Sequence, residues 1–187
     1  RDVPFRDTIQ NLVYLVNGSK GSQVSILDFS NYDIASSCDT SNQRVEPVIF
    51  DGVEVNARAL LPNTLSYDDV LLMGAAIRAQ QMAGALQTLL NLSVNYAQER
   101  QAFGRPIGKF QAVQHNLARL AGETAAAVCA AGSAADALQR AGSFDEDVFF
   151  EIASAKIRVG EAAGEGAGIA HQVHGAIGFT MEHILHR

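Results

Sequence analysis

Residues 121–141 read AGETAAAVCAAGSAADALQRA, and ten of these positions are alanine. The stretch lies within a pattern of apolar residues spaced three or four positions apart, which is typical of an α-helix. Alanine on a helix surface lets the axis of a neighbouring helix approach closely. We therefore interpret this run as the contact surface of one helix in a bundle of packed helices.

Three long helices are expected in the chain, and the alanine run belongs to the second of them. The first runs from about residue 66 to residue 101, with apolar residues at helical spacing: Leu72, Ala76, Ala79, Ala83, Leu86 and Leu90. The second, which holds the alanine run, begins near Pro106, since proline suits a first helical position, and ends near Gly142. Ser143 and Glu146 have capping-box spacing, so a third helix starts there and extends to about His174. Short connections between long helices predict an up-and-down bundle, followed by a turn over 175–180.

The chain before about residue 61 has a different character. Short runs rich in β-branched residues, at 12–16, 23–27, 45–50 and 53–55, alternate with turn residues such as those at 17–21 and predict antiparallel strands. Pro47 has no N–H to donate, which places its strand at a sheet edge or a bulge. So few strands seldom form an independent domain. The expected fold class is α+β: residues 1–63 form part of a β-domain, and residues 64–187 form a helical bundle domain.

The composition excludes several classes of protein. Of 187 residues, 48% are hydrophobic, which is ample for a core, and the formal net charge of −6 argues against nucleic-acid or membrane-surface binding. No apolar run approaches the roughly 20 residues that span a bilayer, and the first ten residues lack the apolar region of a signal peptide. Cys38 and Cys129 are too few for a disulfide framework, so we expect reduced cysteines and a cytoplasmic location.

One segment departs from the acidic balance of the chain. Residues 100–119 contain four cations, Arg100, Arg105, Lys109 and Arg119, and no carboxylate. The segment includes the expected start of the second helix, where the macrodipole is already positive, so the cations are unfavourable unless an anion lies among them. Helix starts with nearby arginine are natural phosphate sites. The alternative is a solvated surface, with Arg100 paired locally to Glu99 or to Asp residues elsewhere.

Two motifs around this segment resemble a known family. Residues 96–114, YAQERQAFGRPIGKFQAVQ, are similar to the run Y-x-x-x-R-x-x-F-G-x-P-I-x-x-F-Q-x-x-Q of the acyl-CoA dehydrogenases. Residues 172–187, QVHGAIGFTMEHILHR, resemble that family's run Q-x-x-G-G-x-G-[FY]-x-x-E. A helical span of family-like length joins them, and residues 45–61 look like the last strands of the family's middle β-domain. The resemblance implies the C-terminal four-helix domain, preceded by the end of that β-domain.

The resemblance also implies a cofactor and a set of contacts. In this family FAD lies across a subunit interface, and the C-terminal domain of one subunit holds the adenosine pyrophosphate end of its neighbour's FAD. Arg100 would contact the pyrophosphate and Gln111 the adenine-ribose side. Phe103 would help to enclose the nucleotide. Five residues would line the other side: Gln172, Val173, His174, Gly175 and Ala176. The implied partners are an acyl-CoA substrate, further subunits in a homo- or hetero-oligomer such as a dimer of dimers, and an electron-transfer flavoprotein or similar acceptor.

The catalytic base that the resemblance requires is absent from this sequence. The family's glutamate removes the α-proton of an acyl-CoA thioester while the flavin accepts the β-hydride. One of its two known positions falls at Gly74, with Ala75 where arginine is usual, and the other lies beyond Arg187. We expect this chain to be inactive alone, either as a fragment or as a reduced subunit that completes FAD sites. A departure from the family's usual pair of glutamate and arginine also occurs in a subgroup that forms heteromeric enzymes, which act on bulky acyl-CoAs, including steroid side chains.

Three other interpretations of the sequence remain open. The chain could be a noncatalytic assembly subunit of the same fold that binds no cofactor. Two His-x-x-His pairs, His171 with His174 and His183 with His186, could suggest a metal site, but the family match explains the region without one. Glu161 and Glu165 could be paired catalytic carboxylates, although Arg158 nearby favours an ion-paired surface.

Overall fold

The computed structural model describes residues 2–4, 11–18, 21–28, 45–47, 59–60, 66–180 and 182–186. The chain divides into two compact units, Arg1–Val70 together with Arg187, and Leu71–His186. We describe each unit by itself. The domain boundary predicted at residues 63 and 64 falls outside the described ranges and stays a prediction.

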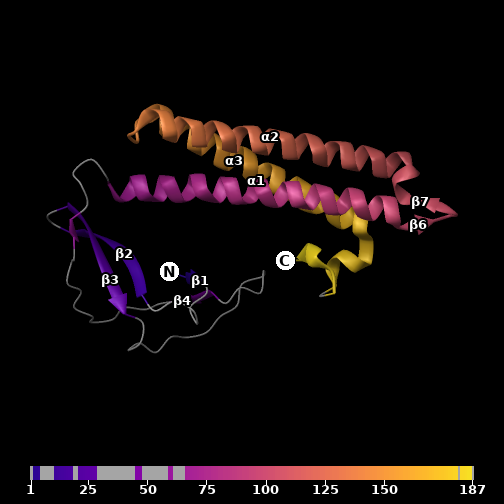
Figure 1. Cartoon of the computed structure of the whole chain (residues 1–187), viewed down its shortest axis with the longest axis horizontal. Helices are drawn as coiled ribbons and strands as arrows, with labels where there is room; N and C mark the ends of the chain where they lie inside the picture. Colours follow the sequence, from indigo (N-terminus) through magenta and orange to yellow (C-terminus); the bar gives the residue numbers. More distant parts are fainter. Residues whose placement is uncertain are drawn as a thin grey trace. The chain divides into compact units, whose positions relative to one another are not determined.

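The described part of the first unit consists of antiparallel strands and the first residues of a helix (Figure 1). Strands β2 (Asn11–Gly18) and β3 (Gly21–Asp28) pair along their full length, from Asn11 opposite Asp28 to Gly18 opposite Gly21. Strand β5 (Ala59–Leu60) extends this sheet beside β3. Strands β1 (Asp2–Pro4) and β4 (Val45–Pro47) form a separate pair.

The strands predicted at 12–16 and 23–27, and the beginning of the one at 45–50, are confirmed. Residues 48–50 and 53–55 lie outside the described residues. Neither β1 nor β5 was predicted as an individual strand, because they have three and two residues and therefore no readable periodicity.

Helix α1 spans Tyr67–Glu99, as predicted. Ser66 and Asp69 cap its beginning reciprocally: the Asp69 N–H donates to Ser66 Oγ at 3.1 Å, and the Ser66 N–H donates to Asp69 Oδ2 at 2.6 Å. This exchange satisfies two N–H groups that have no partner within the helix. Asp69 is therefore a helix-capping carboxylate.

A hairpin and a short 3₁₀ helix follow α1, and they correct the predicted start of the second helix. Strands β6 (Gln101–Ala102) and β7 (Arg105–Pro106) pair around Phe103 and Gly104. Pro106 thus belongs to a strand, and after the 3₁₀ helix η3 (Ile107–Lys109) the helix α2 begins at Gln111 and ends at Ala141. The prediction from Pro106 was wrong because pairing across the hairpin, which local spacing does not reveal, sets the conformation there.

The link between α2 and α3 brings a second correction. Gly142 ends α2 in the left-handed region, with a φ of 64°, as its place in the sequence suggested. Helix α3 spans Glu146–His174, but its N-cap is Asp145, whose Oδ1 accepts from the Val148 N–H at 2.9 Å. The predicted capping box on Ser143 was therefore wrong. After His174 the chain forms two 3₁₀ helices, η4 (Gly175–Phe179) and η5 (Ile184–His186).

Small side chains fill the core of the bundle. Alanines from all three helices are fully or almost fully buried and meet one another and a few larger residues: Ala79, Ala83, Leu86, Ala127, Ala131, Val159 and Ala162. The three helices lie alongside one another in Figure 1, and Gln80 Nε2 donates to the Ala131 carbonyl at 2.6 Å between α1 and α2. The interpretation of the alanine run as a close helix contact is confirmed.

Candidate functional site

The β6–β7 hairpin projects an aromatic side chain from one end of the bundle. Phe103 has a positive φ of 52° and its side chain is 96% exposed, and Gly104 has a φ of 77°. The hairpin is fixed at its base, where the Ile107 N–H donates to the Arg100 carbonyl at 2.8 Å. An exposed phenylalanine in a left-handed conformation is unfavourable in a free surface loop, so the position suits a ring that covers a ligand or another chain.

Phe110 organises the residues that precede α2. Its ring lies edge-on to Phe103, with centroids 6.2 Å apart, and the Arg105 guanidinium lies 4.3 Å from its centroid. Phe110 is also the N-cap of α2, and it has no side-chain acceptor for the N–H groups of the first turn. That turn, which begins with the exposed Gln111, contains no acidic residue. The helix start therefore keeps its partial positive charge uncompensated.

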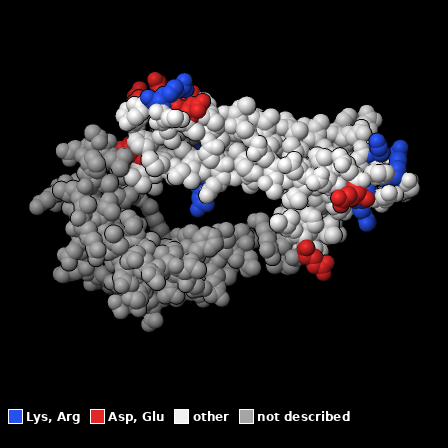
Figure 2. All heavy atoms as spheres, in the orientation of Figure 1, with Lys and Arg blue, Asp and Glu red and all other residues white. Residues whose placement is uncertain are grey.

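Three of the four cations at this end have no carboxylate partner among the described residues. The fourth, Arg119, pairs with Glu165 across the α2–α3 contact, so the unbalanced set is smaller than predicted. Arg100 forms no ion pair with Glu99. Figure 2 shows basic side chains gathered at the end of the bundle where the hairpin lies. The remaining cations, Arg100, Arg105 and Lys109, form a positive surface beside an uncapped helix start.

The end of α3 forms the other half of the predicted site. Gln172, Gly175 and Ala176 are exposed, and Gly175 has a φ of 66°, which only glycine adopts without strain. They border an open hollow of about 610 Å³ that also contacts Gly168, His171 and Phe179. The side chains of Val173 and His174 are instead buried, with 7% and 4% exposed. These two residues could reach a ligand through their backbone, while their side chains belong to the core.

His174 occupies a closely packed position between α1 and α3. Its Nδ1 donates to the Ala170 carbonyl at 2.8 Å, and its ring stacks on Tyr96 with centroids 4.5 Å apart. Nε2 is buried and has no hydrogen-bond partner among the described residues. Burial lowers the pKa of His174 below its ordinary 6.5, against a smaller opposing effect of the hydrogen bond to Ala170. The imidazole is therefore neutral at neutral pH.

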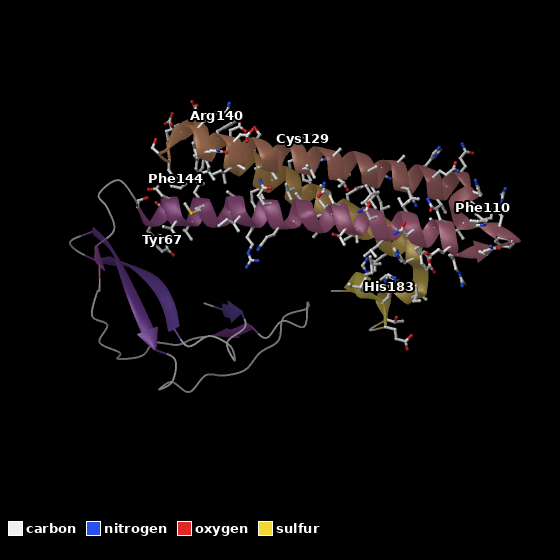
Figure 3. All side chains as sticks on the ribbon, in the orientation of Figure 1. Tyr67, Phe110, Cys129, Arg140, Phe144 and His183 are labelled. Atoms are coloured by element: carbon white, nitrogen blue, oxygen red, sulfur yellow. The ribbon has the colours of Figure 1, made fainter. Side chains whose placement is uncertain are left out.

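The stack of Tyr96 on His174 brings the two halves of the predicted site to the same end of the bundle. Tyr96 precedes Arg100 by one helical turn, and the Arg100 N–H donates to the Tyr96 carbonyl at 2.9 Å. His174 lies within the predicted run from Gln172 to Ala176. Figure 3 shows Phe110 and His183 at this end, and Arg140 and Phe144 at the opposite end. Segments more than 70 residues apart in sequence are thus adjacent in space.

The remaining predicted residues have simpler surroundings. Gly74 is exposed on α1 with nothing within 4 Å of a Cβ built on it, and Arg187 lies outside the described residues. Glu161 pairs with Arg158, which also pairs with Glu123, and Glu165 pairs with Arg119. The interpretation of these two glutamates as an ion-paired surface is confirmed.

No group of three or more histidine, cysteine or acidic side chains is arranged to hold a metal in the part of the chain that the structure describes. That part does not include the side chain of His186. Cys129 is exposed and unbonded, and Cys38 is not among the described residues. None of the described helices is both long and apolar enough to cross a bilayer.

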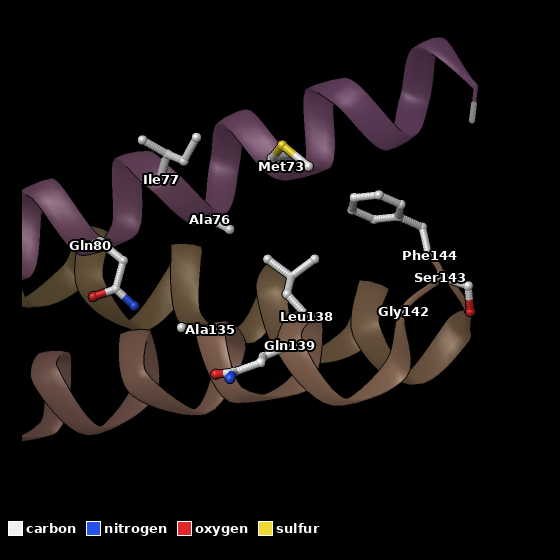
Figure 4. A pocket seen from close by; sticks show the side chains of 10 residues that line it. All are labelled: Met73, Ala76, Ile77, Gln80, Ala135, Leu138, Gln139, Gly142, Ser143 and Phe144. Atoms are coloured by element: carbon white, nitrogen blue, oxygen red, sulfur yellow. The ribbon is translucent and has the colours of Figure 1, made fainter. Parts of the chain in front are cut away.

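An apolar hollow of about 490 Å³ lies at the opposite end of the bundle (Figure 4). Met73 and Ile77 from α1 face Leu138 from α2 across it, and Phe144 closes one side. It lies beside the stretch of α1 that contains Gly74, whose own Cβ position is open.

The sequence analysis gave no structural role to Tyr96 or Phe110, although both stand in the quoted motif. Aromatic residues flanking the basic segment were the available signal. Their partners, His174 and Arg105, depend on how the helices pack and how the hairpin turns.

Comparisons with known proteins agree with this architecture. The family model described as "Acyl-CoA dehydrogenase, C-terminal domain" matches residues 69–187. Acyl-CoA dehydrogenase IpdE2 of Mycobacterium tuberculosis is 36% identical over 112 residues, which make up 60% of this chain and 32% of that protein. The human mitochondrial short-chain specific acyl-CoA dehydrogenase is 36% identical over 110 residues, 59% of this chain and 26% of that protein.

Solved structures match almost the whole chain. The Tcur3481-Tcur3483 steroid ACAD G363A variant aligns with a TM-score of 0.84 and 26% identity over 99% of this chain and 50% of that one. Glutaryl-CoA dehydrogenase in complex with glutaryl-CoA aligns with a TM-score of 0.79 and 24% identity over 98% of this chain and 49% of that one, which shows the fold alone. The chain thus spans about a third of these curated relatives' length and half of these solved chains. Since the family model covers well over half of the chain, the protein belongs to the acyl-CoA dehydrogenase family.

Proposed function

We propose that this chain supplies the inter-subunit FAD-binding surface of an acyl-CoA dehydrogenase. Arg100, Phe103 and Gln111 form one part of that surface, and the run from Gln172 to Ala176 forms the other. The observation that carries the proposal is the positive surface of Arg100, Arg105 and Lys109, which has no carboxylate partner among the described residues. Arginine side chains beside an uncapped helix start are suited to bind an anion such as a phosphate group.

The residues fit the diphosphate and the adenosine of this cofactor. Arginine forms paired hydrogen bonds with phosphate oxygens, and the uncapped N–H groups of α2 add the favourable end of a helix dipole. The exposed Phe103 ring offers a flat apolar face to an aromatic group. The glycine at 175 lets a ligand approach the backbone closely.

The chemistry would belong to the assembled protein rather than to this chain alone. FAD, when bound, supplies the hydride acceptor for α,β-dehydrogenation of an acyl-CoA thioester. The residues described here would hold and orient the cofactor, and none of them replaces the missing base, because Gly74 has no side chain. Proton removal would fall to a carboxylate from another part of a longer protein or from a partner subunit. A homo- or hetero-oligomer, with an electron-transfer flavoprotein as acceptor, is part of this proposal.

The test is the FAD content of the assembled protein. A charge-assisted hydrogen bond contributes about 1.5–3 kcal/mol, so Arg100→Gln should weaken FAD binding roughly ten- to hundred-fold, and Gln111→Ala should weaken it further. Arg140→Gln, at the far end of α2, is the matched control and should leave the flavin absorbance unchanged. Equal FAD content in wild type and in the Arg100→Gln, Gln111→Ala double variant would show that this surface does not bind the cofactor.

Gly74, which has no side chain that could act as a base, favours a second candidate function. In this alternative, the chain is a noncatalytic assembly subunit that keeps the fold and binds no cofactor. It predicts a purified assembly whose flavin content does not depend on Arg100 or Gln111.

A further inference from the structure

We propose that His174, in its neutral form, is a positioning residue that joins the two halves of the candidate cofactor surface, and that its protonation releases residues 175–180 and 182–185. The role in cofactor binding rests on the proposed function. We call the contacts of His174 with Tyr96 and with the segment after α3 the joint. The joint depends only on this chain's own residues, so it can be tested separately from the role in cofactor binding.

The first side of the joint is the contact with α1. The His174 and Tyr96 rings are stacked, with an interplanar angle of 24° and centroids 4.5 Å apart. The hydrogen bond from Nδ1 to the Ala170 carbonyl fixes the imidazole in that orientation. Because Tyr96 lies one turn before Arg100, the stack holds the hairpin end of α1 against the end of α3.

The second side of the joint is the chain that follows α3. A Cβ on the buried Gly178 would lie 3.2 Å from His174 Cβ and 2.8 Å from Leu185 Cδ2, so the segment packs closely over His174. The His183 ring lies 4.8 Å from the His174 ring, centroid to centroid. His174 is therefore enclosed by α1 on one side and by the C-terminal segment on the other.

The surroundings of His174 oppose a positive charge. The titratable group that faces it from α1 is Tyr96; His171 faces it from α3 and His183 from the C-terminal segment, while η4 contributes no ionisable side chain. Among the described residues, the charges that act on His174 are those of two other histidines, so none of these residues supplies an anion to compensate an imidazolium there. Protonation would also turn Nε2 into a buried donor without an acceptor among the described residues.

The direction of the pH effect follows from this geometry. The pKa of His174 is lowered in the folded protein, so the opened segment binds a proton more readily than the closed one. The free energy that favours the closed segment does not change with pH above the ordinary pKa of 6.5. It decreases as the pH falls below 6.5, until the pH is below the lowered pKa that His174 has in the folded protein. Uptake of one proton increases the opening equilibrium at most tenfold for each pH unit.

The experiment is hydrogen exchange of peptides from residues 172–186, measured on the assembled protein between about pH 8 and pH 5 and corrected for intrinsic exchange rates. In wild type the protection should fall as the pH drops below 6.5. His174→Phe keeps a ring on Tyr96 and cannot titrate, so its protection should not depend on pH. His115→Phe, at an exposed position on α2, is the matched control and should retain the wild-type profile.

Two results would overturn the joint. One is wild-type protection that does not change with pH, a result that needs no variant to fold. The other is a pH profile of His174→Phe that coincides with wild type, which would assign the titration to His171 or His183.

FAD content in the same pH series tests the positioning role. The expected result is that wild type loses FAD together with protection and His174→Phe does not. If the segment opens and FAD stays bound, while Arg100→Gln still reduces FAD content, then the positioning role is wrong and the proposed function stands. If FAD content also fails to respond to Arg100→Gln, the proposed function itself fails.

Discussion

Gly166 and Leu120 meet where α3 crosses α2, and replacing both tests how tightly this contact is packed. Leu120 is fully buried, and a Cβ added to Gly166 would lie 3.1 Å from Leu120 Cδ1 and 2.8 Å from Leu86 Cδ2. Both distances are shorter than ordinary van der Waals contact, so the leucine ends must shift when a methyl group is added. The same methyl group would occupy part of the space that Leu120→Ala leaves.

The magnitudes follow from these contacts. Leu120→Ala shortens a fully buried isobutyl side chain to a methyl group, and should lower the free energy of unfolding by about 3 kcal/mol. Gly166→Ala gains up to about 1 kcal/mol of helix propensity but costs about 1–3 kcal/mol through overpacking, so it should be neutral to destabilising. In the double variant we expect a loss smaller than the sum of the two single losses by about 1 kcal/mol.

The assay is guanidinium unfolding followed by far-ultraviolet circular dichroism, with all m-values compared to confirm that the transition is unchanged. Gly160→Ala is the matched control, because a Cβ there meets nothing within 4 Å; it should stabilise α3 and add independently to Leu120→Ala. Additivity of Gly166→Ala and Leu120→Ala to within about 0.3 kcal/mol would refute the packing that we derive for this contact.

Two further predictions concern the helix ends. Asp145→Ala should lower the free energy of unfolding by about 1 kcal/mol through loss of the cap on α3, whereas Ser143→Ala should have little effect; the reverse order in denaturation midpoints would restore the Ser143 capping box. Gly142→Ala should cost about 1 kcal/mol because the residue has a φ of 64° with free space around it, while Gly132→Ala inside α2 should stabilise; thermal unfolding of the pair measures both, and equal shifts would contradict the left-handed cap.

Local patterns predicted the helices well because they repeat over many residues. The three helices follow apolar spacing, and Gly142 stops α2 through its own backbone freedom. The errors lie where two local signals compete over a few residues. Pro106 suits a helix start, but the hairpin pairs it with Gln101. Ser143 and Asp145 are both good caps, and the choice depends on how the chain returns after Gly142 to bury Val148.

The candidate site was predictable as a set of residues but not as a surface. The motif identified Arg100 and Gln172 because specific side chains recur at fixed spacing in the family. Burial of His174 could not be predicted, since it depends on Tyr96 arriving from a helix 78 positions earlier in the chain. The ion pair of Arg119 could not be predicted for the same reason, because its partner Glu165 lies on a different helix.

The alanine contacts between the helices restrict how this protein can change over evolutionary time. A single nucleotide change converts an alanine codon to one for serine, glycine, threonine, valine, proline, aspartate or glutamate. At Ala127 or Ala131, both fully buried, the last five would overfill the contact, break the helix or bury a charge. Glycine and serine fit by volume, but each lowers helix propensity.

Single substitutions at these positions can therefore lower the stability of the folded protein, but almost none of them can raise it. Variation that the protein tolerates should concentrate on the exposed positions of the helices, while the contact itself stays at its present size.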